Sequence, residues 1–340
     1  MGRKTVYNNI TSPEKLAQVN KKNMELKRDF LDYLISIDRS KRTLSGYDSD
    51  LDIFFCWNLE HNDNKYFIDL TKREIAKFQK FAMADWGWST NRLARVKSVL
   101  SSMSNYVENI LDDEVPDFRG IIRKVESPIK QPVRDKTVIS NEEVQMILDT
   151  LVEKKKYQCA CVFALAAFGG ARKSELLRYK VFYFDDENIM SDAALYQTPE
   201  KIKTKGRGSA GKALIKYTLL DFKKYFDLWM KQREELGIDN EYLFVKPETN
   251  EVLKISTLDS YTDTISKILG RPFYFHSLRH QLCTRLSKIG LPANVIQEYF
   301  GWSNSSMIEV YDDSEASESF GNFFTKDGIK GSETKGLSDL

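Results

Sequence analysis

The sequence has no long apolar run, few cysteines and histidines, and almost no net charge. No apolar stretch reaches the roughly 18 residues of a membrane span, and the polar N-terminus lacks the apolar core of a signal peptide. We therefore expect a cytoplasmic protein without a membrane partner. The four cysteines form no CxxC pair and the chain has only three histidines, which argues against a structural zinc site or a disulfide framework. We expect neither a metal nor a cofactor.

The small net charge makes no case for a nucleic-acid partner, so the distribution of charge matters more than the sum. Lys and Arg total 51 and Asp and Glu total 49, a balance of +2. The basic residues are clustered, which predicts a basic surface offset by acidic residues elsewhere, although solvated helix faces would carry the same clusters. The clusters are Lys21-Lys22, Lys27-Arg28, Arg39 to Arg42, Lys72-Arg73, Arg92 to Lys97, Arg119 to Lys136 and Lys201 to Lys216.

The first third of the chain has the apolar spacing of amphipathic helices. Residues 1–20 carry no periodic pattern, and we expect them to be flexible. Apolar residues then recur every three or four positions in four stretches, the second, third and fourth opening near Ser40, at Thr71 and at Ser89 or Thr90. In the first stretch this stripe runs from Met24 to Ile35. The pattern predicts a helical domain over residues 21–126.

A proline-containing basic stretch separates this domain from a second one. Residues before proline avoid the α region, so residues 127–136 are predicted to form an extended linker. The second domain, residues 137–315, opens with a predicted capping box, Ser140 with Glu143, and a buried helix follows over residues 159–168.

The rest of the second domain is predicted to mix short strands with helices. Strands are expected at 181–184, 194–196 and 242–245, and a hairpin at 201–217 with glycines at its centre. Further helices are expected at 219–236, 256–269, 277–288, 292–300 and 305–311.

One set of polar residues near the C-terminal end points to chemistry. His276 and Arg279 lie three residues apart, Trp302 follows Arg279 by 23 residues, and Tyr311 follows Trp302 by nine. No pair of catalytic carboxylates accompanies them. A guanidinium stays charged at every physiological pH, and a phenol is a hydroxyl nucleophile. This set suits attack on a phosphodiester without a metal.

Three stretches, residues 169–177, 275–280 and 300–311, resemble the signature boxes of the tyrosine recombinase (phage integrase) family. The likeness covers roughly residues 21–315, and its specific part is the ordered spacing of His276, Arg279, Trp302 and Tyr311. It implies a mainly α fold with a small β-sheet, in which a SAM-like helical core-binding domain precedes an α+β catalytic domain. It also implies site-specific DNA strand cleavage and religation, for a phage or another mobile element.

The resemblance assigns a role to each residue of the set. Tyr311 would attack the scissile phosphate and form a 3′-phosphotyrosyl link. A phenol has an unperturbed pKa of about 10, so it needs a base, and His276 is the candidate. Arg172 and Arg279 would hold the non-bridging oxygens, where charge builds in the transition state. Trp302, which stands where many members have His, can donate one hydrogen bond but cannot take up a proton.

Other residues are expected to support this site or to contact DNA. The family takes its general acid from a hairpin lysine, for which Lys205 fits best and Lys203 is the alternative. Glu175 and His280 are expected to support the site. The candidate DNA-binding residues are Arg42, Arg92, Arg95, Lys97, Lys130, Arg134, Lys203 and Arg207.

The resemblance also predicts partners, and two departures leave room for a rival function. The expected partners are double-stranded DNA with specific core sites, further copies of the chain up to a tetramer in the synapse, and an accessory DNA-bending protein. We expect a nucleoid-associated location in a bacterial or host cell, and a C-terminal tail (316–340) that docks on a neighbour through Phe320, Phe323 and Phe324. Lys173 stands where an aliphatic residue is usual, and Asp312-Asp313 follow Tyr311. A DNA-binding repressor that does not cut, or a topoisomerase-like enzyme, would keep much of this pattern.

Overall fold

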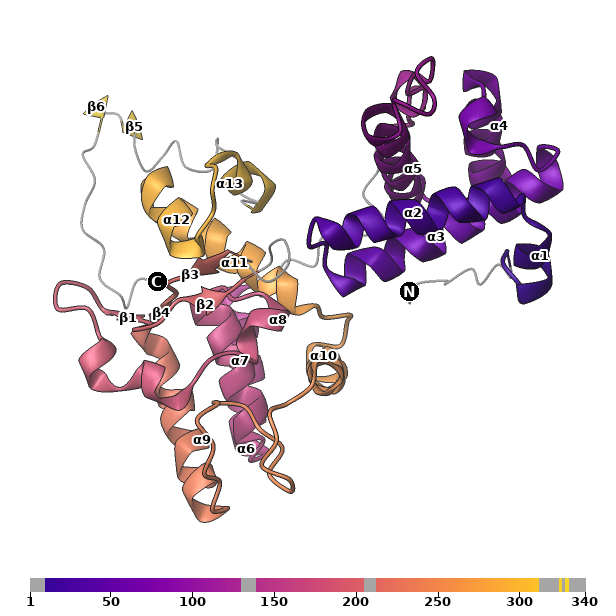
Figure 1. The fold of residues 1–340 in the computed structure, drawn as a ribbon. Helices are drawn as coiled ribbons and strands as arrows, with labels where there is room; N and C mark the ends of the chain where they lie inside the picture. Colours follow the sequence, from indigo (N-terminus) through magenta and orange to yellow (C-terminus); the bar gives the residue numbers. More distant parts are fainter. Residues whose placement is uncertain (1–9, 130–138, 205–211, 312–323, 326–327, 330–340) are drawn as a thin grey trace. The chain divides into compact units, whose positions relative to one another are not determined.

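The described part of the chain forms two compact units, which divide near residue 135. The computed structural model describes residues 10–129, 139–204, 212–311, 324–325 and 328–329 (Figure 1). The predicted class is confirmed: helices dominate, and the described strands are short. Among these residues no helix is both long and apolar enough to cross a bilayer.

The first unit is built from helices around an aromatic core. The four predicted helices are present, as α2 (Lys21–Ser36), α3 (Lys41–His61), α4 (Lys72–Ala84) and α5 (Thr90–Ile110). Ser40, Thr71 and Ser89 cap the last three, and Thr71 forms a capping box with Glu74. Two 3₁₀ turns follow α3 and α5, η1 (Phe67–Asp69) and η2 (Ile122–Lys124).

Two expectations for this unit are wrong. Within the segment expected to be flexible, Pro13–Gln18 form helix α1, because Ser12 caps it and Ile10 and Val19 at its two ends are buried. At the end of α2, Ile35 was assigned to the apolar stripe but is 59% exposed. A stripe narrows at a helix end, where fewer neighbouring helices remain to cover it.

The second unit is arranged around one buried helix. This is α7 (Tyr157–Gly169), where the buried helix was predicted, and it contacts α6 (Asn141–Glu153), α9 (Lys223–Glu235) and α11 (Phe275–Lys288) (Figure 1). The predicted capping box of Ser140 and Glu143 opens α6. The remaining elements are α8 (Lys173–Leu176), α10 (Ile255–Leu269), α12 (Ala293–Phe300), α13 (Ser306–Tyr311), η4 (Asp186–Asn188) and η5 (Leu220–Phe222).

The predicted hairpin contains two antiparallel strand pairs, one enclosed by the other. Strand β1 (Leu195–Gln197) pairs antiparallel with β4 (Tyr217–Leu219), with Tyr196 opposite Thr218. Between them β2 (Ile202–Lys203) pairs with β3 (Ala213–Leu214), with Ile202 opposite Leu214. The third described pair, β5 (Phe324–Thr325) with β6 (Gly328–Ile329), lies in the C-terminal tail. Phe320 and Phe323 lie outside the described residues.

Two predicted strands are wrong. Val181–Phe184 form a 3₁₀ helix, η3, in which the adjacent Tyr183 and Phe184 are both buried. A short apolar run has no periodicity that separates a strand from a helical turn, and only the tertiary packing decides between them. Residues 242–245 form isolated bridges, Tyr242 with Lys180 and Val245 with Val252, rather than a strand.

Gly170 ends α7 in a conformation that a larger residue would strain. Its φ is +58°, and a Cβ there would lie 2.4 Å from Cε1 of Phe300. We expect Gly170→Ala to lower the free energy of unfolding by roughly 2–4 kcal/mol, from left-handed strain together with a steric clash. Chemical denaturation measures this change.

Gly237 provides the matched control for this substitution. It also has a positive φ, +64°, but a Cβ there meets no atom within 4 Å. Gly237→Ala should therefore show the backbone strain alone, about 1 kcal/mol. Equal losses for the two variants would contradict the proposed clash with Phe300.

Candidate active site

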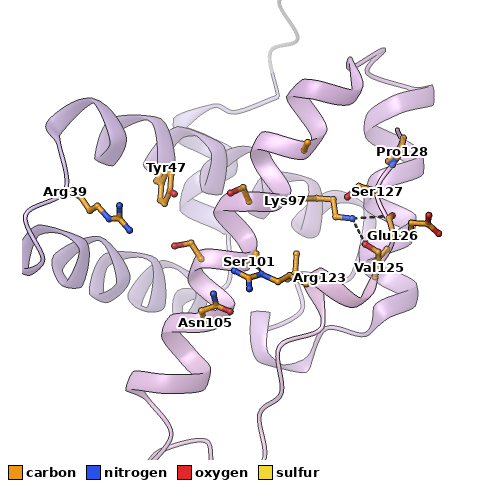
Figure 2. A pocket seen from close by; sticks show the side chains of 14 residues that line it. Arg39, Tyr47, Lys97, Ser101, Asn105, Arg123, Val125, Glu126, Ser127 and Pro128 are labelled. Atoms are coloured by element: carbon orange, nitrogen blue, oxygen red, sulfur yellow. Dashed lines mark hydrogen bonds between the residues drawn. The ribbon is translucent and has the colours of Figure 1, made fainter. Parts of the chain in front are cut away.

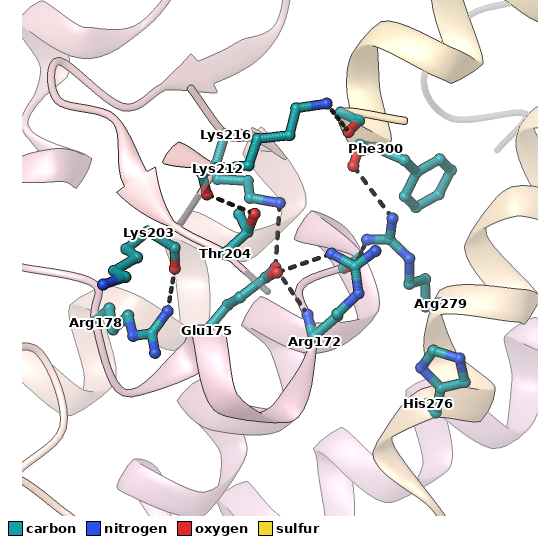
Figure 3. Close-up of polar contacts among 12 residues, drawn as sticks. Arg172, Glu175, Arg178, Lys203, Thr204, Lys212, Lys216, His276, Arg279 and Phe300 are labelled. Atoms are coloured by element: carbon teal, nitrogen blue, oxygen red, sulfur yellow. Dashed lines mark hydrogen bonds and ion pairs between the residues drawn. The ribbon is translucent and has the colours of Figure 1, made fainter. Parts of the chain in front are cut away.

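The turn after α7 carries an arginine and a buried carboxylate. Arg172 stands at the start of α8, and its Nη1 donates to Glu175 Oε1 at 2.9 Å, while its backbone N–H donates to Glu175 Oε2 at 3.1 Å. Lys216 contributes a third contact, Nζ to Glu175 Oε2 at 3.1 Å (Figure 3). Burial by itself raises the pKa of the Glu175 carboxyl, but attraction to Lys216 and Arg172 outweighs it, and the pKa lies below its usual value. Glu175 is therefore an anion inside the protein.

Arg279 is held in place by backbone carbonyls. On α11 it is only 1% exposed, and it donates to Gly170 O at 2.6 Å and to Phe300 O at 3.1 Å. Its guanidinium also lies over the rings of Phe300, at 4.6 Å, and Trp302, at 5.2 Å. Burial and the nearby Arg172 lower its pKa to about 10, so it remains charged at neutral pH.

The phenol of Tyr311 meets an imidazole. Tyr311 ends α13 and is 6% exposed, and its Oη lies 3.1 Å from Nε2 of His276 on the first turn of α11. His276 is exposed, yet partial desolvation and the electrostatic influence of the nearby His280, Arg279 and Arg172 lower its pKa to about 4. A neutral imidazole with its proton on Nδ1 can accept the phenol proton at Nε2.

Aromatic rings surround the phenol. The ring of Tyr311 lies 4.9 Å from that of Trp302 and 4.5 Å from that of His280. The indole Nε1 of Trp302 is buried and has no hydrogen-bond partner in the described part of the chain. A buried donor without an acceptor is costly, so this N–H is suited to an oxygen that a ligand brings.

The predicted hairpin lysines are described only in part. Lys205 and Arg207 lie outside the described residues, as do Lys130 and Arg134 of the linker. Lys203 is exposed on β2, where its carbonyl accepts a hydrogen bond from Arg178 (Figure 3).

The other candidate DNA-binding residues differ in how they are placed. Arg42 is exposed, Arg92 stacks on the Trp88 ring at 4.5 Å, and Arg95 lies 2.9 Å from Asp50 Oδ2. Lys97, by contrast, is 5% exposed. Its ammonium donates to Gln79 Oε1 and to the carbonyls of Val125 and Glu126. Lys97 thus ties α5 to the segment that follows η2, and its ammonium is engaged within the first unit.

Sequence reasoning missed two features. Lys216 was seen only as part of a basic cluster, and nothing in its spacing signals burial. In the first unit, an open polar hollow lies between α5 and residues 122–128, lined by Arg39, Tyr47, Asn105 and Arg123 among others (Figure 2). Arg39 and Arg123 belonged to predicted basic clusters, but only the fold brings them to one hollow.

Comparisons with known proteins identify the family of this chain. The model of the phage integrase family matches residues 137–318. A relative from Bacillus subtilis (strain 168), the SPbeta prophage-derived recombinase-like protein YomM, is 27% identical over 304 residues, 87% of this chain and 88% of its own. Tyrosine recombinase XerA of Pyrococcus horikoshii is 25% identical over 299 residues, 85% of this chain and 89% of its own.

Solved structures of recombinases share the fold. The XerH site-specific recombinase bound to a palindromic difH substrate aligns with a TM-score of 0.60 at 15% identity, covering 88% of this chain and 95% of its own. A lambda integrase dimer bound to a COC′ core site aligns with a TM-score of 0.58 at 15% identity, covering 86% of this chain and 96% of its own. Because the family match spans more than half of the chain, this protein belongs to the phage integrase family of tyrosine recombinases.

Proposed function

We propose that this protein is an active site-specific recombinase that cuts and rejoins DNA through Tyr311. The observation that carries the proposal is the 3.1 Å contact between the Tyr311 phenol and the neutral His276 imidazole, beside two arginines. A nucleophile with its base in hydrogen-bond reach is the arrangement that covalent catalysis needs.

In the proposed cleavage step the Tyr311 oxygen attacks the scissile phosphorus while its proton passes to His276 Nε2. The bond from phosphorus to the 5′-oxygen breaks, which leaves a 3′-phosphotyrosyl link. The departing 5′-oxygen takes a proton from a hairpin lysine, Lys205 or else Lys203. Religation reverses these transfers, so the step as written needs no metal and no nucleotide.

Three donors would stabilise the charge that builds on the non-bridging oxygens. Arg279 is fixed by its two carbonyl acceptors, while the Arg172 side chain is 29% exposed and so can turn N–H groups toward a ligand. The indole N–H of Trp302 supplies a third, neutral donor. Donors that are already oriented stabilise a transition state without reorganising.

We also propose that DNA lies along the polar hollow of the first unit. Arg39 and Arg123 provide positive charge there, and Ser98, Ser102 and Asn105 provide neutral donors for phosphate oxygens (Figure 2). Arg42, Arg92 and Arg95 are exposed on the two helices that border this hollow, α3 and α5.

The proposed working assembly is a tetramer on two DNA sites, by analogy with a related lambda integrase tetramer bound to a Holliday junction. The likeness to a prophage-derived protein supports a mobile-element origin.

Trapping of the covalent intermediate tests this function. A DNA site is first selected by binding from a randomised duplex library. It is then rebuilt with a nick near the cleavage point, so that the short fragment with the new 5′-hydroxyl diffuses away after cleavage and religation is prevented. We expect an adduct that survives denaturant, forms in the presence of EDTA, and maps to Tyr311. Tight specific binding without an adduct would instead indicate a non-cutting regulator. An adduct accompanied by plasmid relaxation by a monomer would indicate a topoisomerase.

The pH dependence of adduct formation tests His276 as the base. Its pKa in the folded protein is lowered to about 4, so the neutral, accepting form persists as pH falls below the ordinary histidine value of about 6.5. At subsaturating DNA, which reports on the free enzyme, we expect the acid limb of the rate to have its midpoint between 4 and 6.5. His276→Gln should remove that limb and slow the reaction about 10²-fold or more. A midpoint above 6.5 would contradict this assignment.

A further inference from the structure

A buried lysine shares the Glu175 carboxylate with Arg172. Lys216, between β3 and β4, is 2% exposed and its ammonium lies 3.1 Å from Glu175 Oε2. Its backbone is pinned as well, since its N–H donates to Thr198 Oγ1 at 3.0 Å and its carbonyl accepts from Thr198 N at 2.9 Å. The ammonium therefore has little freedom to leave Glu175.

The carboxylate of Glu175 is shared between two cations. Oε1 accepts from the Arg172 side chain, and Oε2 accepts from the Arg172 backbone and lies against Lys216 (Figure 3). Glu175 itself is 0% exposed, so its charge must be balanced inside the protein. Without Lys216, Arg172 would be the closest cation left to balance it, and a guanidinium prefers to grip a carboxylate with two N–H groups.

We propose that Lys216 is a positioning residue that keeps Arg172 available for phosphate. By occupying Oε2, it limits the Arg172 side chain to the single contact with Oε1 at 2.9 Å, and the remaining guanidinium N–H groups can face the partly exposed side. Lys216 touches neither DNA nor Tyr311 in this role. The inference rests on the proposed function, because it concerns the phosphate that Arg172 would bind.

The test reads the Arg172–phosphate contact without needing cleavage. In a Tyr311→Phe background, affinities are measured for duplexes in which a neutral methylphosphonate replaces one phosphate at a time across the selected site. At the phosphate that Arg172 contacts, we expect the duplex with the charged diester to bind about 10-fold more tightly than the duplex with the neutral methylphosphonate. Adding Lys216→Met should reduce this preference to about 2-fold, because Arg172 turns toward Glu175. Preferences at the other phosphates should not change.

Three further variants separate positioning from a merely structural role. Lys216→Arg keeps the buried charge and should retain the preference, whereas Lys201→Met removes an exposed lysine of the same hairpin and should leave the preference unchanged. If Lys216→Met does not fold, Lys216→Gln is measured instead. Its amide is shorter than the lysine side chain and uncharged, so it neither reaches Oε2 as closely nor balances the Glu175 charge, and it is expected to lower the preference. A folded Lys216→Met or Lys216→Gln protein that keeps the full preference overturns the proposal.

The wild-type adduct assay distinguishes this result from a failure of the proposed function. If the wild-type protein forms an adduct, Lys216→Met should form it about 10- to 100-fold more slowly, since small misplacements of a catalytic group have effects of this size. An unchanged rate would count against Lys216. If the wild-type protein forms no adduct, cleavage fails as the function, and the affinity ratio still decides whether Lys216 positions Arg172.

Discussion

We expect Tyr311→Phe to form no covalent adduct and still to bind its DNA site with nearly the wild-type affinity. The substitution removes the attacking oxygen but keeps the ring that packs against Trp302 and His280. Loss of a nucleophile that nothing replaces should slow strand cleavage by at least about 10⁴-fold. The free energy of unfolding should fall by only about 1 kcal/mol, for the lost hydrogen bond to His276. Adduct formation on the nicked duplex and gel-shift binding measure the two effects.

Tyr299→Phe is the matched control. Tyr299 is another buried phenol of the same unit, and it donates to the carbonyl of Phe168 rather than to a histidine. Its substitution leaves that carbonyl without this donor, so we expect the free energy of unfolding to fall by about 1–3 kcal/mol. The adduct should still form. An adduct formed by Tyr311→Phe would show that another residue is the nucleophile.

We expect Arg279→Lys to lose most of the proposed cleavage activity even though it keeps the positive charge. The guanidinium uses separate N–H groups for Gly170 O and Phe300 O and lies over the Trp302 ring, which a single ammonium cannot reproduce. We expect adduct formation to slow about 10³-fold, the scale for removing a preorganised donor. We also expect the free energy of unfolding to fall by roughly 3 kcal/mol. One of the two buried carbonyls loses its donor, and the buried lysine cation has fewer hydrogen-bond partners than the guanidinium. Single-turnover kinetics and denaturation measure both.

Arg285→Lys controls for the loss of a partly buried arginine on the same helix. Its pKa is lowered by burial, as for Arg279, but it neighbours Asp221 and Tyr299 rather than Tyr311. The cleavage rate of Arg285→Lys should stay within about 3-fold of wild type, about 0.7 kcal/mol in the barrier. If Arg279→Lys keeps a tenth of the wild-type rate or more, the proposed role of Arg279 in holding the non-bridging oxygens is wrong.

Local signals carried much of the prediction of the fold. Side-chain periodicity and caps act over three or four residues, so α2 to α5, the helix start at Thr71 and the capping box of Ser140 could be predicted from the sequence. Segments that depend on distant partners were predicted less well. The 3₁₀ turn at Val181–Phe184 and helix α1 are set by what packs against them, which a short window does not contain.

The same division holds at the candidate site. The sequence alone determined which side chains are candidates, because Arg172, His276, Arg279, Trp302 and Tyr311 stand in an ordered spacing typical of one family. Only the tertiary structure decided which of them meet and which other residues they contact. It brought the Tyr311 phenol to His276 across 35 residues, buried Lys216 against Glu175, and enclosed Lys97 among carbonyls. The physical reason is that burial and long-range ion pairs depend on the packed interior, whereas spacing along the chain depends on the sequence itself.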